Sequence, residues 1–593
     1  MVFIVTQPSQ SIVILLGRLW WHLGARRQRQ FGFLFVLMTL TSFAEVLSLG
    51  AILPFLSALT APQRVFDSPL ARPFIDAFEV TSPKQLLLAL TIAFGVAVIF
   101  AGAMRLLLLW ATTRLSYATG ADLSINVYRR TLYQSYKTHL ARNSSEIING
   151  IFSKTASTIS TITLVLSLMS CGVMLVAILA ALLTIDPLIA MAAFSGFGAI
   201  YIVIIQLARR RLLLDSQIVA RESTQVIKSL QEGLGGIRDV LLDGSQSAYC
   251  KIYSDADLPL RRAQGNGLFI SQSPRHGVEA LGMLLIAGLA YVLAQQEDGS
   301  AKAIPVLGAL ALGAQRLLPV LQQAYGAWAG IRSGQASLQD TLELLDQPLP
   351  DYASGAKPEP LPFDHQIRLR DLSFRYSEEA PWVLASVNLS IAKGSRVGFI
   401  GTTGTGKSTL LDIVMGLLEP SKGGLEVDGI PINAINQRAW QQHIAHVPQT
   451  IFLADSTIEE NIAFGVPADQ IDHERVRQAA KRAQISDAID SWPKKYKTYV
   501  GERGARLSGG QRQRIGIARA LYKQADVIIF DEATSALDNE TEQAVIDAID
   551  GLSKELTVLI IAHRLTTLKN CVQIVELDKG SINRIGGYQM LVD

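Results

Sequence analysis

The sequence has little charge and almost no cysteine. Of its 593 residues, 18% are charged, the formal net charge is only +3, and three residues are cysteines. Because the basic residues are few and scattered, the sequence excludes the charged stripe of a nucleic-acid-binding protein. Cys171, Cys250 and Cys571 lie far apart without a CxxC pair, which excludes a disulfide framework and a cysteine-based zinc site.

Apolar residues are abundant instead. They make up 49% of the chain, and the mean hydropathy is positive, which indicates a membrane protein with a soluble part. Apolar runs of about 20 residues, the length needed to cross a bilayer, recur in the first half. They predict about six transmembrane helices, near residues 31–58, 86–112, 161–184, 187–208, 277–296 and 303–327. The long polar stretches after the second and fourth runs have helical patterning and are predicted to extend those helices into the cytoplasm.

The positions of Lys and Arg predict the orientation in the membrane. Basic residues precede the first apolar run and lie in both long polar stretches, whereas the connections near residues 184 and 295 are acidic or neutral. The positive-inside rule therefore places both termini in the cytoplasm. In the N-terminal segment "SIVILLGRLWWHLGARR" the charges follow the apolar run, which argues against a cleaved signal peptide. We expect an interfacial helix anchored by Trp20 and Trp21.

A composition change divides the chain into parts. The segment "LLDQPLPDYASGAKPEPLPF" is rich in proline and is typical of a linker. After it, short β-rich runs alternate with helical ones, which predicts an α/β domain. We therefore predict an α-helical transmembrane domain over 1–343, a linker over 344–366 and an α/β P-loop domain over 367–593.

The α/β domain begins with a phosphate-binding loop. In "GFIGTTGTGKSTLL" a β-like run ending at Ile400 enters a glycine-rich turn, and a helix follows, which is the context that a P-loop requires. Backbone N–H groups and the helix N-terminus would bind phosphate oxygens, Lys407 would reach the β- and γ-phosphates, and Ser408 would hold Mg²⁺. The predicted ATP-binding residues of this loop are Gly401, Thr402, Thr403, Gly404, Thr405, Gly406, Lys407, Ser408 and Thr409.

Two further segments carry chemistry. The apolar run in "DVIIFDEATSALD" predicts a buried strand that ends at Asp531, a candidate Mg²⁺ partner, with Glu532 as the candidate base or positioner for the attacking water. In "RLSGGQRQRIGIARAL" a second anion-binding helix start follows Leu507 and comprises Ser508, Gly509, Gly510 and Gln511. Because one nucleotide does not need two such helix starts from one chain, we expect this one to close on the nucleotide of a second copy.

These motifs occur in the order and spacing of ABC transporter ATPase domains, and the resemblance covers residues 367–593. It implies that Tyr376 in "FRYS" stacks on adenine, that Gln449 in "VPQ" senses Mg²⁺, and that His563 in "IIAHRL" contacts the γ-phosphate. The "SALD" segment contributes Asp538 to the nucleotide site. Taken alone, Tyr376, Gln449 and His563 would be ordinary surface, packing or structural residues, so their roles depend on the whole set of motifs.

The fusion of about six spans to one such domain resembles a half-size ABC exporter. The resemblance implies an integral cell-membrane protein with a cytoplasmic ATPase domain. Two copies would form the working unit, use ATP with Mg²⁺ and move a substrate by alternating access.

Three arginines in the apolar runs bear on the substrate. Arg105, Arg275 and Arg316 fall in or beside spans, toward their cytoplasmic ends, where arginine side chains would suit an anionic, phosphorylated head group. Alternatively, Arg105 and Arg275 reach the interface by snorkelling, or Arg275 pairs with Glu279 at i, i+4. For Arg316 the alternative is an internal pair with Glu45.

The membrane half also resembles PglK-type lipid-linked oligosaccharide flippases, in the segments "SQSPRHGVEALG" and "GAQRLLPVLQQ". This resemblance implies a polyprenyl-diphosphate-linked glycan as substrate and a short external helix near residues 68–79. Two alternatives stay open: export of another amphiphile, such as a lipid A-like lipid, a drug or a peptide, and a non-transporting ATPase that regulates a membrane partner.

Overall fold

The chain was analysed in a computed structural model. The structure describes residues 10–60, 62–67, 82–185, 187–294, 317–353, 355, 358–532, 543, 546–547, 549, 551, 553, 555–562 and 564–592. The chain divides into two compact units: 1–134 with 142–349, and 135–141 with 350–593. We call them the membrane unit and the ATPase unit. The short helix α6 (Tyr136–Ala141) belongs to the ATPase unit although it lies in the first half of the sequence.

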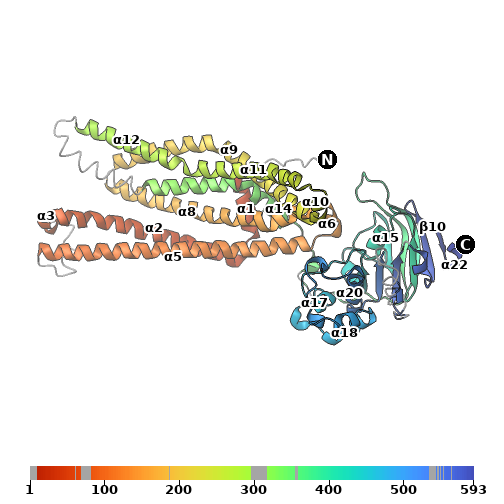
Figure 1. Ribbon diagram of the computed structural model, residues 1–593. Helices are drawn as coiled ribbons and strands as arrows, with labels where there is room; N and C mark the ends of the chain where they lie inside the picture. Colours follow the sequence, from red (N-terminus) through yellow and green to blue (C-terminus); the bar gives the residue numbers. More distant parts are fainter. Residues whose placement is uncertain are drawn as a thin grey trace. The chain divides into compact units, whose positions relative to one another are not determined.

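The membrane unit is helical throughout its described residues (Figure 1). Its elements are α1 (Ile12–His22), α2 (Ala25–Thr60), α3 (Pro62–Phe66), α5 (Pro83–Leu132), α7 (Ser144–Asn149), the π-helix η1 (Gly150–Lys154), α8 (Thr155–Ile185), α9 (Pro187–Gly235), α10 (Ile237–Leu242), α11 (Gln246–Gln272), α12 (Pro274–Ala294), a helix over 317–333, and α14 (Gln335–Leu345). Four predicted spans fall within α2, α5, α8 and α9. The fifth begins in α12, and the sixth is described from residue 317 onward. The predicted external helix near 68–79 lies outside the described residues.

The long helices are longer than a bilayer is thick. α5 has 50 residues and α9 has 49, so each is about 75 Å long at 1.5 Å per residue, against a hydrocarbon core of about 30 Å. The polar second halves of both helices are therefore the extensions that the sequence predicts. Three of the described segments, Ala25–Ser48, Pro83–Leu132 and Ser144–Ala181, are long and apolar enough to span a membrane.

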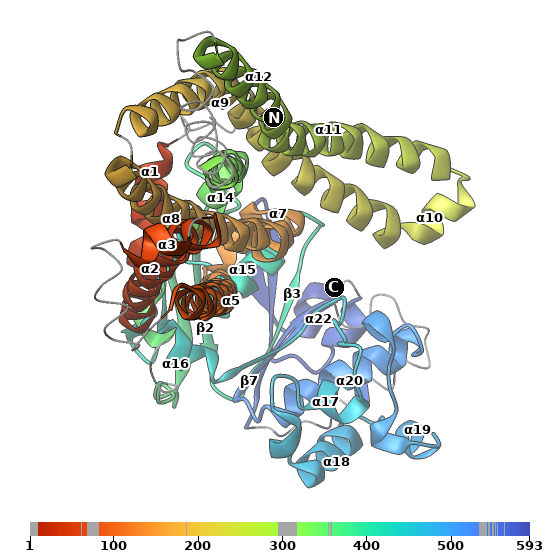
Figure 2. The same cartoon turned by 90° about the vertical axis from the view of Figure 1, so that its left-hand side faces the viewer.

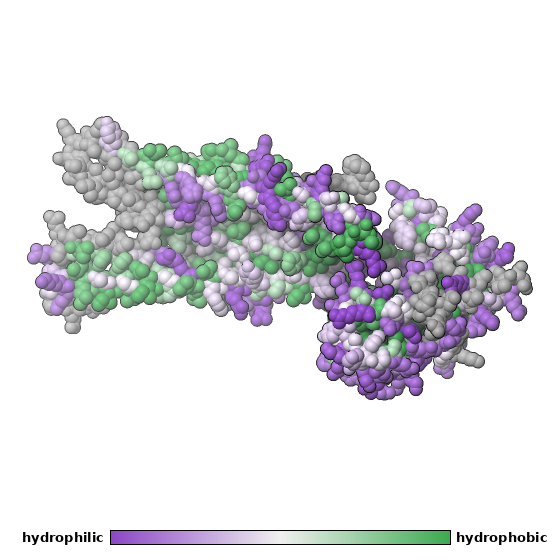
Figure 3. All heavy atoms as spheres, viewed as in Figure 1, coloured by the Kyte–Doolittle hydropathy of each residue, from purple (hydrophilic) through white to green (hydrophobic). Residues whose placement is uncertain are grey.

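The exposed side chains of α5 indicate that the helix faces lipid. Leu88, Ile99, Leu106 and Trp110 are each more than 60% exposed, and hydrophobic side chains gather along α2 and α5 in Figure 3. Such a surface is unfavourable in water but not in lipid. The helix α1 has a similar double character, because Leu15 and Leu19 are buried whereas Trp21 is 84% exposed.

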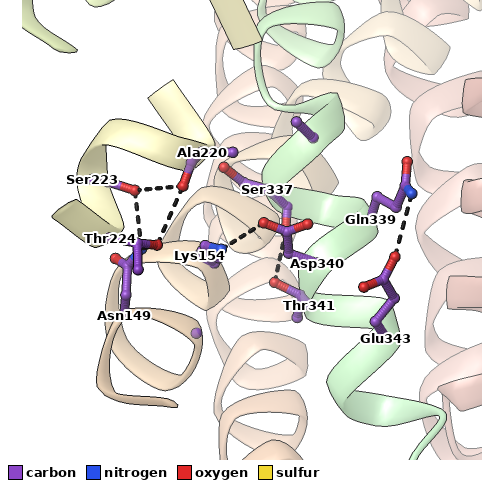
Figure 4. A network of polar contacts seen from close by, with 12 residues as sticks. Asn149, Lys154, Ala220, Ser223, Thr224, Ser337, Gln339, Asp340, Thr341 and Glu343 are labelled. Atoms are coloured by element: carbon purple, nitrogen blue, oxygen red, sulfur yellow. Dashed lines mark hydrogen bonds and ion pairs between the residues drawn. The ribbon is translucent and has the colours of Figure 1, made fainter. Parts of the chain in front are cut away.

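A polar layer joins several helices of the membrane unit (Figure 4). The buried Asn149 donates to the Ser223 and Thr224 hydroxyls at 3.0 and 2.8 Å, and Lys154 pairs with Asp340 at 2.5 Å. These contacts come from α7, η1, α9 and α14. Since polar partners must align to form such bonds, this layer fixes the rotation of the helices more strictly than apolar packing would.

The ATPase unit contains two sheets (Figures 1 and 2). One has the order β2-β1-β4-β5 with antiparallel pairs, and the other has the order β10-β9-β3-β8-β7-β6, parallel except for β10. The strands are β1 (Gln366–Phe374), β2 (Leu384–Ala392), β3 (Arg396–Ile400), β4 (Lys422–Val427), β5 (Ile430–Pro431), β6 (Ile444–Val447), β7 (Val527–Asp531), β8 (Thr557–Ile561), β9 (Gln573–Asp578) and β10 (Ser581–Gly586). The predicted α/β class is confirmed.

The helices of the ATPase unit pack on this framework. They are α15 (Lys407–Val414), α16 (Gln437–Gln441), α17 (Ile458–Ile462), α18 (His473–Arg482), α19 (Ser486–Asp490), α20 (Gly509–Tyr522) and α22 (Tyr588–Val592). α20 packs against α17 and α18 (Figure 2). The central strands β3, β7 and β8 are buried, as expected of parallel strands covered on both faces. Their carboxyl ends carry the site described below.

Asp428 attaches the end of the linker to the β-sheet, and we expect its charge to stabilise the ATPase unit. Its carboxylate accepts hydrogen bonds from the backbone N–H groups of His365 and Gln366 at 3.0 and 2.7 Å, and from that of Asp364. Although burial acts to raise the pKa of Asp428, these bonds hold it below the usual value. The stabilisation is therefore present above the unfolded pKa of about 3.9 and is lost as the pH falls below it.

Asp428→Asn keeps a residue that tolerates the left-handed backbone at φ 48° but removes the charge. Thermal unfolding should show a loss of about 1 kcal/mol at pH 7 and a weaker dependence of stability on pH below about 4. Asp490→Ala, at an exposed carboxylate 3.7 Å from Lys495, is the control. Equal stability of wild type and Asp428→Asn at pH 7 would contradict this role.

Candidate functional site

The phosphate-binding loop has the predicted strand-loop-helix geometry. β3 ends at Ile400 and α15 begins at Lys407. Gly401, Gly404 and Gly406 have φ values of 144°, 88° and 94°, which L side chains rarely adopt. A Cβ atom on Gly401 would lie 2.3 Å from the Leu577 carbonyl oxygen. The tight loop therefore requires glycine, and it leaves the backbone close to any bound phosphate.

Backbone carbonyl groups of the loop hold the Lys407 side chain in place. Its side chain is buried, and Nζ donates to the carbonyl oxygens of Gly401 and Thr402 at 2.8 and 3.0 Å. The Thr405 hydroxyl donates to the same Thr402 carbonyl at 2.9 Å. An ammonium group has three N–H donors, so one donor and the full positive charge are available to a phosphate at the start of α15.

Acidic groups meet at the carboxyl end of β7. Burial, and then the negative charge of Glu532, raise the pKa of Asp531, while Lys407 and a hydrogen bond from Ser408 act in the opposite direction. Burial and the charge of Asp531 also raise the pKa of Asp412 on α15 to about 6. A cation at this place would relieve the repulsion between these carboxylates.

These residues fit the predicted Mg²⁺ site. Ser408, Asp531 and Gln449 offer a hydroxyl, a carboxylate and an amide oxygen, which are hard donors. Among the described residues, no group of three or more His, Cys, Asp or Glu side chains forms a metal cage. Mg²⁺ is usually bound by one or two carboxylates together with substrate phosphates, so the few protein oxygens named above would suffice.

Glu532 and Gln449 are in direct contact. The Gln449 amide donates from Nε2 to Oε2 of Glu532 at 2.8 Å. Glu532 has φ 50°, in the left-handed region, and its N–H donates to the Ile561 carbonyl. Such a backbone costs about 1–3 kcal/mol and is concentrated at functional sites. Glu532 thus directly follows the end of β7, where its carboxylate is held by the Gln449 amide.

Tyr376 lies next to the P-loop helix. Its hydroxyl is 3.1 Å from the Thr409 hydroxyl, and its ring meets Phe374 edge-on with centroids 5.0 Å apart. The side chain is nevertheless 41% exposed, so a ring face is accessible to a base. The structure thus brings Tyr376 to the loop, while the stacking role remains a prediction.

The second helix start is also formed as expected. Ser508 caps α20: its hydroxyl accepts from the Gln511 N–H at 3.2 Å, and the Gln511 side chain accepts from the Ser508 N–H at 2.9 Å. Ser508 and Gly509 are exposed. This capping box fixes the first turn and leaves N–H groups of α20 directed outward, where an anion can bind.

The three arginines predicted to bind substrate have different positions. Arg105 forms an ion pair with the buried Glu45, a pair that was not predicted from the sequence. Arg275 pairs with Glu279 at 3.0 Å in the i, i+4 arrangement. Arg316, like His563 and Asp538, lies outside the described residues.

Arg275 lines a cavity of about 760 Å³ in the membrane unit. Gln322 donates to the same Glu279 oxygen at 3.3 Å, and the buried Tyr201 hydroxyl has no hydrogen-bond partner within the described part of the chain. Such a hydroxyl costs free energy unless something pairs with it. The lining residues are Tyr201, Ser271, Gln272, Arg275, His276, Glu279, Leu318, Pro319, Gln322, Gln323, Tyr325 and Gly326.

Sequence reasoning missed two residues that the structure brings to these sites. Gln513, in α20, donates to the Gln449 carbonyl. The sequence did contain a sign of its importance: Gln513 is a polar residue on the buried face of the helix, four positions before Ile517. Tyr201 in the fourth apolar run carried no signal beyond its hydroxyl, because its partners depend on how the helices pack.

The two-sheet unit defines an ABC-type ATPase, because it combines a P-loop, an Asp-Glu pair at the end of a strand and a capped helix start that can bind an anion. It is joined to a helical membrane unit of the exporter type. The chain belongs to the ABC transporter family and is an integral membrane protein whose ATPase domain is cytoplasmic. The ABC transporter family model matches residues 384–535. A solved structure of a bacterial Atm1-family ABC exporter with ATP bound superimposes with a TM-score of 0.75 at 25% identity, over 95% of this chain and 96% of that one.

The chain is also similar to curated ATP-dependent lipid A-core flippases. It is 31% identical to that of Alkalilimnicola ehrlichii over 405 residues, 67% of each chain. It is 41% identical to that of Saccharophagus degradans over 264 residues, 44% of each chain. The aligned part spans 64% of the length of the Ralstonia nicotianae flippase, at 31% identity. The match to the Saccharophagus protein thus covers less than half of that relative's length.

Proposed function

We propose that this protein is an ATP-driven flippase that moves an anionic glycolipid from the cytoplasmic to the outer leaflet. The observation that carries the proposal is the cavity in the membrane unit, lined by the Arg275–Glu279 pair, the Gln322 amide and the Tyr201 hydroxyl, which has no hydrogen-bond partner among the residues that the structure describes. Amides and hydroxyls bind sugar hydroxyls, and an arginine binds phosphate. The ATPase unit supplies the driving force.

A lipid A-like lipid is the first candidate, because the curated relatives are lipid A-core flippases. A polyprenyl-diphosphate-linked oligosaccharide is the second. One observation favours it: the two segments that resemble PglK-type flippases, 271–282 and 313–323, contribute nine of the cavity's residues, from Ser271 to Gln323. Both candidates are lipids that carry a phosphorylated saccharide, so the cavity would bind the same chemical groups in either one.

The mechanism uses two copies of the chain. ATP bound by the loop 401–409 of one copy would be closed over by the start of α20 of the other, and closure would be transmitted to the membrane helices. Glu532 then accepts the proton of the attacking water, held in position by the Gln449 amide. Hydrolysis removes the contact between the copies, and the cavity returns to its first orientation.

Reconstitution in proteoliposomes tests the proposal. Lipid A-core, a polyprenyl-diphosphate glycan and a neutral phospholipid should be compared for stimulation of ATPase activity and for appearance in the outer leaflet. We expect the anionic glycolipids to stimulate and to be translocated, with lipid A-core most active. ATP hydrolysis that no lipid changes, with no translocation, would contradict the flippase and favour the regulator alternative.

Arg275→Gln should weaken the binding of the anionic glycolipid. Removing a charged hydrogen bond costs about 1.5–3 kcal/mol, so the lipid concentration for half-maximal ATPase stimulation should rise about 10- to 150-fold while basal ATPase stays unchanged. Arg261→Gln is the matched control, since Arg261 pairs with Asp257 four residues away at 3.1 Å and does not line the cavity. Equal half-maximal concentrations for Arg275→Gln and wild type would remove Arg275 from the substrate site.

A further inference from the structure

The segment 449–453 is fastened to α20 at three points. Gln513 donates from Nε2 to the Gln449 carbonyl at 2.9 Å, and Arg519 donates from Nη1 to the Phe452 carbonyl at 2.9 Å. Between them, a Cβ atom on Gly516 would lie 2.5 Å from Ile451 Cδ1, so glycine permits a close approach there. The segment is therefore held closely against the helix by two hydrogen bonds and one apolar contact.

The first fastening leads directly to the catalytic carboxylate. Gln513 holds the backbone of Gln449, and the side chain of Gln449 donates to Glu532 at 2.8 Å. Two hydrogen bonds thus connect α20 to the base that would accept a proton from water. Gln513 touches neither the P-loop nor Glu532 in any described hydrogen bond, so its effect on the reaction would be indirect.

Space filling alone does not explain Gln513. The side chain is only 8% exposed, among buried residues such as Ile515 and Ile517. Its Oε1 is buried without a hydrogen-bond partner among the described residues. An apolar side chain of the same size would avoid the cost of that oxygen. The hydrogen bond that the amide donates to the Gln449 carbonyl explains why a glutamine occupies this position.

The position of Gln513 on α20 relates two nucleotide sites. Ser508 caps the start of α20 and in the proposed dimer closes on the nucleotide of the second copy, and Gln513 follows about 7.5 Å further along the helix. Gln449 and Glu532, by contrast, act on the nucleotide of their own copy. We propose that Gln513 is a positioning residue that couples the two ATP sites, by setting Gln449 and Glu532 of one site according to the position of α20 at the other. This inference rests on the proposed dimeric ATPase.

Steady-state ATPase kinetics of Gln513→Met, in the full-length protein, test the coupling. Methionine keeps the length of the side chain but cannot donate. We expect kcat to fall roughly tenfold, because small displacements of catalytic groups are costly. KM for ATP should stay within about twofold, since the P-loop is untouched, and the Hill coefficient should fall to about 1. Gln478→Met is the matched control, because Gln478 is an exposed helical glutamine of α18 bonded to Glu474.

The outcomes separate the two proposals. Wild-type protein that does not hydrolyse ATP overturns the proposed function and this inference with it. Active wild type with unchanged kcat and Hill coefficient in Gln513→Met overturns the inference alone. A lower kcat with an unchanged Hill coefficient overturns the coupling, because Gln513 would then act on its own site. Gln513→Leu, which is similar in size and has no donor, should reproduce the effect, and it decides the case if the methionine variant has a lower Tm.

Discussion

Glu532→Gln should bind ATP and hydrolyse it about 10²–10⁴-fold more slowly than wild type, the usual contribution of a general base. Glutamine has the same shape, and its carbonyl oxygen can still accept the Gln449 hydrogen bond of 2.8 Å, but it cannot take a proton from water. ATP binding should persist because the P-loop is unchanged. The charge of Glu532 raises the pKa of Asp531, so its removal favours the ionised Asp531 that a metal requires.

Phosphate release and equilibrium binding of labelled ATP, measured on the same preparation, test this expectation. Glu426→Gln is the matched control, because Glu426 pairs with Arg370 at 3.0 Å on the antiparallel sheet and is not part of the nucleotide site. Hydrolysis by Glu532→Gln at the wild-type rate would assign the base to another residue. Loss of both binding and hydrolysis would indicate a structural role for Glu532.

The local geometry of the predicted nucleotide site agrees with the sequence because its motifs are contiguous in the chain. Strand, loop and helix from Ile400 to Thr409 are contiguous, so the backbone alone places them. The same holds for the Ser508–Gln511 capping box, and also for the Arg275–Glu279 pair, whose spacing of four residues decides the contact on any helix. In each case the geometry of a single element suffices.

The remainder depends on packing between elements. Arg105 and Glu45 come from α5 and α2, and their contact requires the relative rotation and shift of two long helices. Gln513 and Gln449 are 64 residues apart, and their bond requires the exact approach that Gly516 permits. Periodicity identifies the buried face of a helix but not its neighbour. The polar layer around Asn149 was likewise beyond prediction, because each of its bonds joins separate helices.

Lys407→Ala should reduce ATP affinity by about 10²-fold and abolish ATP-dependent transport. The estimate follows from the loss of charge-assisted hydrogen bonds to a phosphate, worth about 1.5–3 kcal/mol each. Within the loop 401–409, no other described side chain carries a positive charge that could replace them. Lys393→Ala is the matched control, since Lys393 Nζ also donates to a backbone carbonyl, that of Phe363, at 2.6 Å. Equilibrium binding of labelled ATP, without turnover, measures the effect directly.

Lys407 has two separable roles, and the same variant distinguishes them. Its ammonium group braces the loop through the Gly401 and Thr402 carbonyls, and it would also bind phosphate. If bracing were its whole role, Lys407→Ala would lower Tm, as Lys393→Ala would, and excess ATP would restore the loop with near-normal affinity. If the charge binds phosphate, affinity falls even where Tm is unchanged, because the glycine-determined backbone keeps its shape while the electrostatic attraction is gone. Comparing the two lysines therefore tests whether the buried charge belongs to the fold or to the nucleotide.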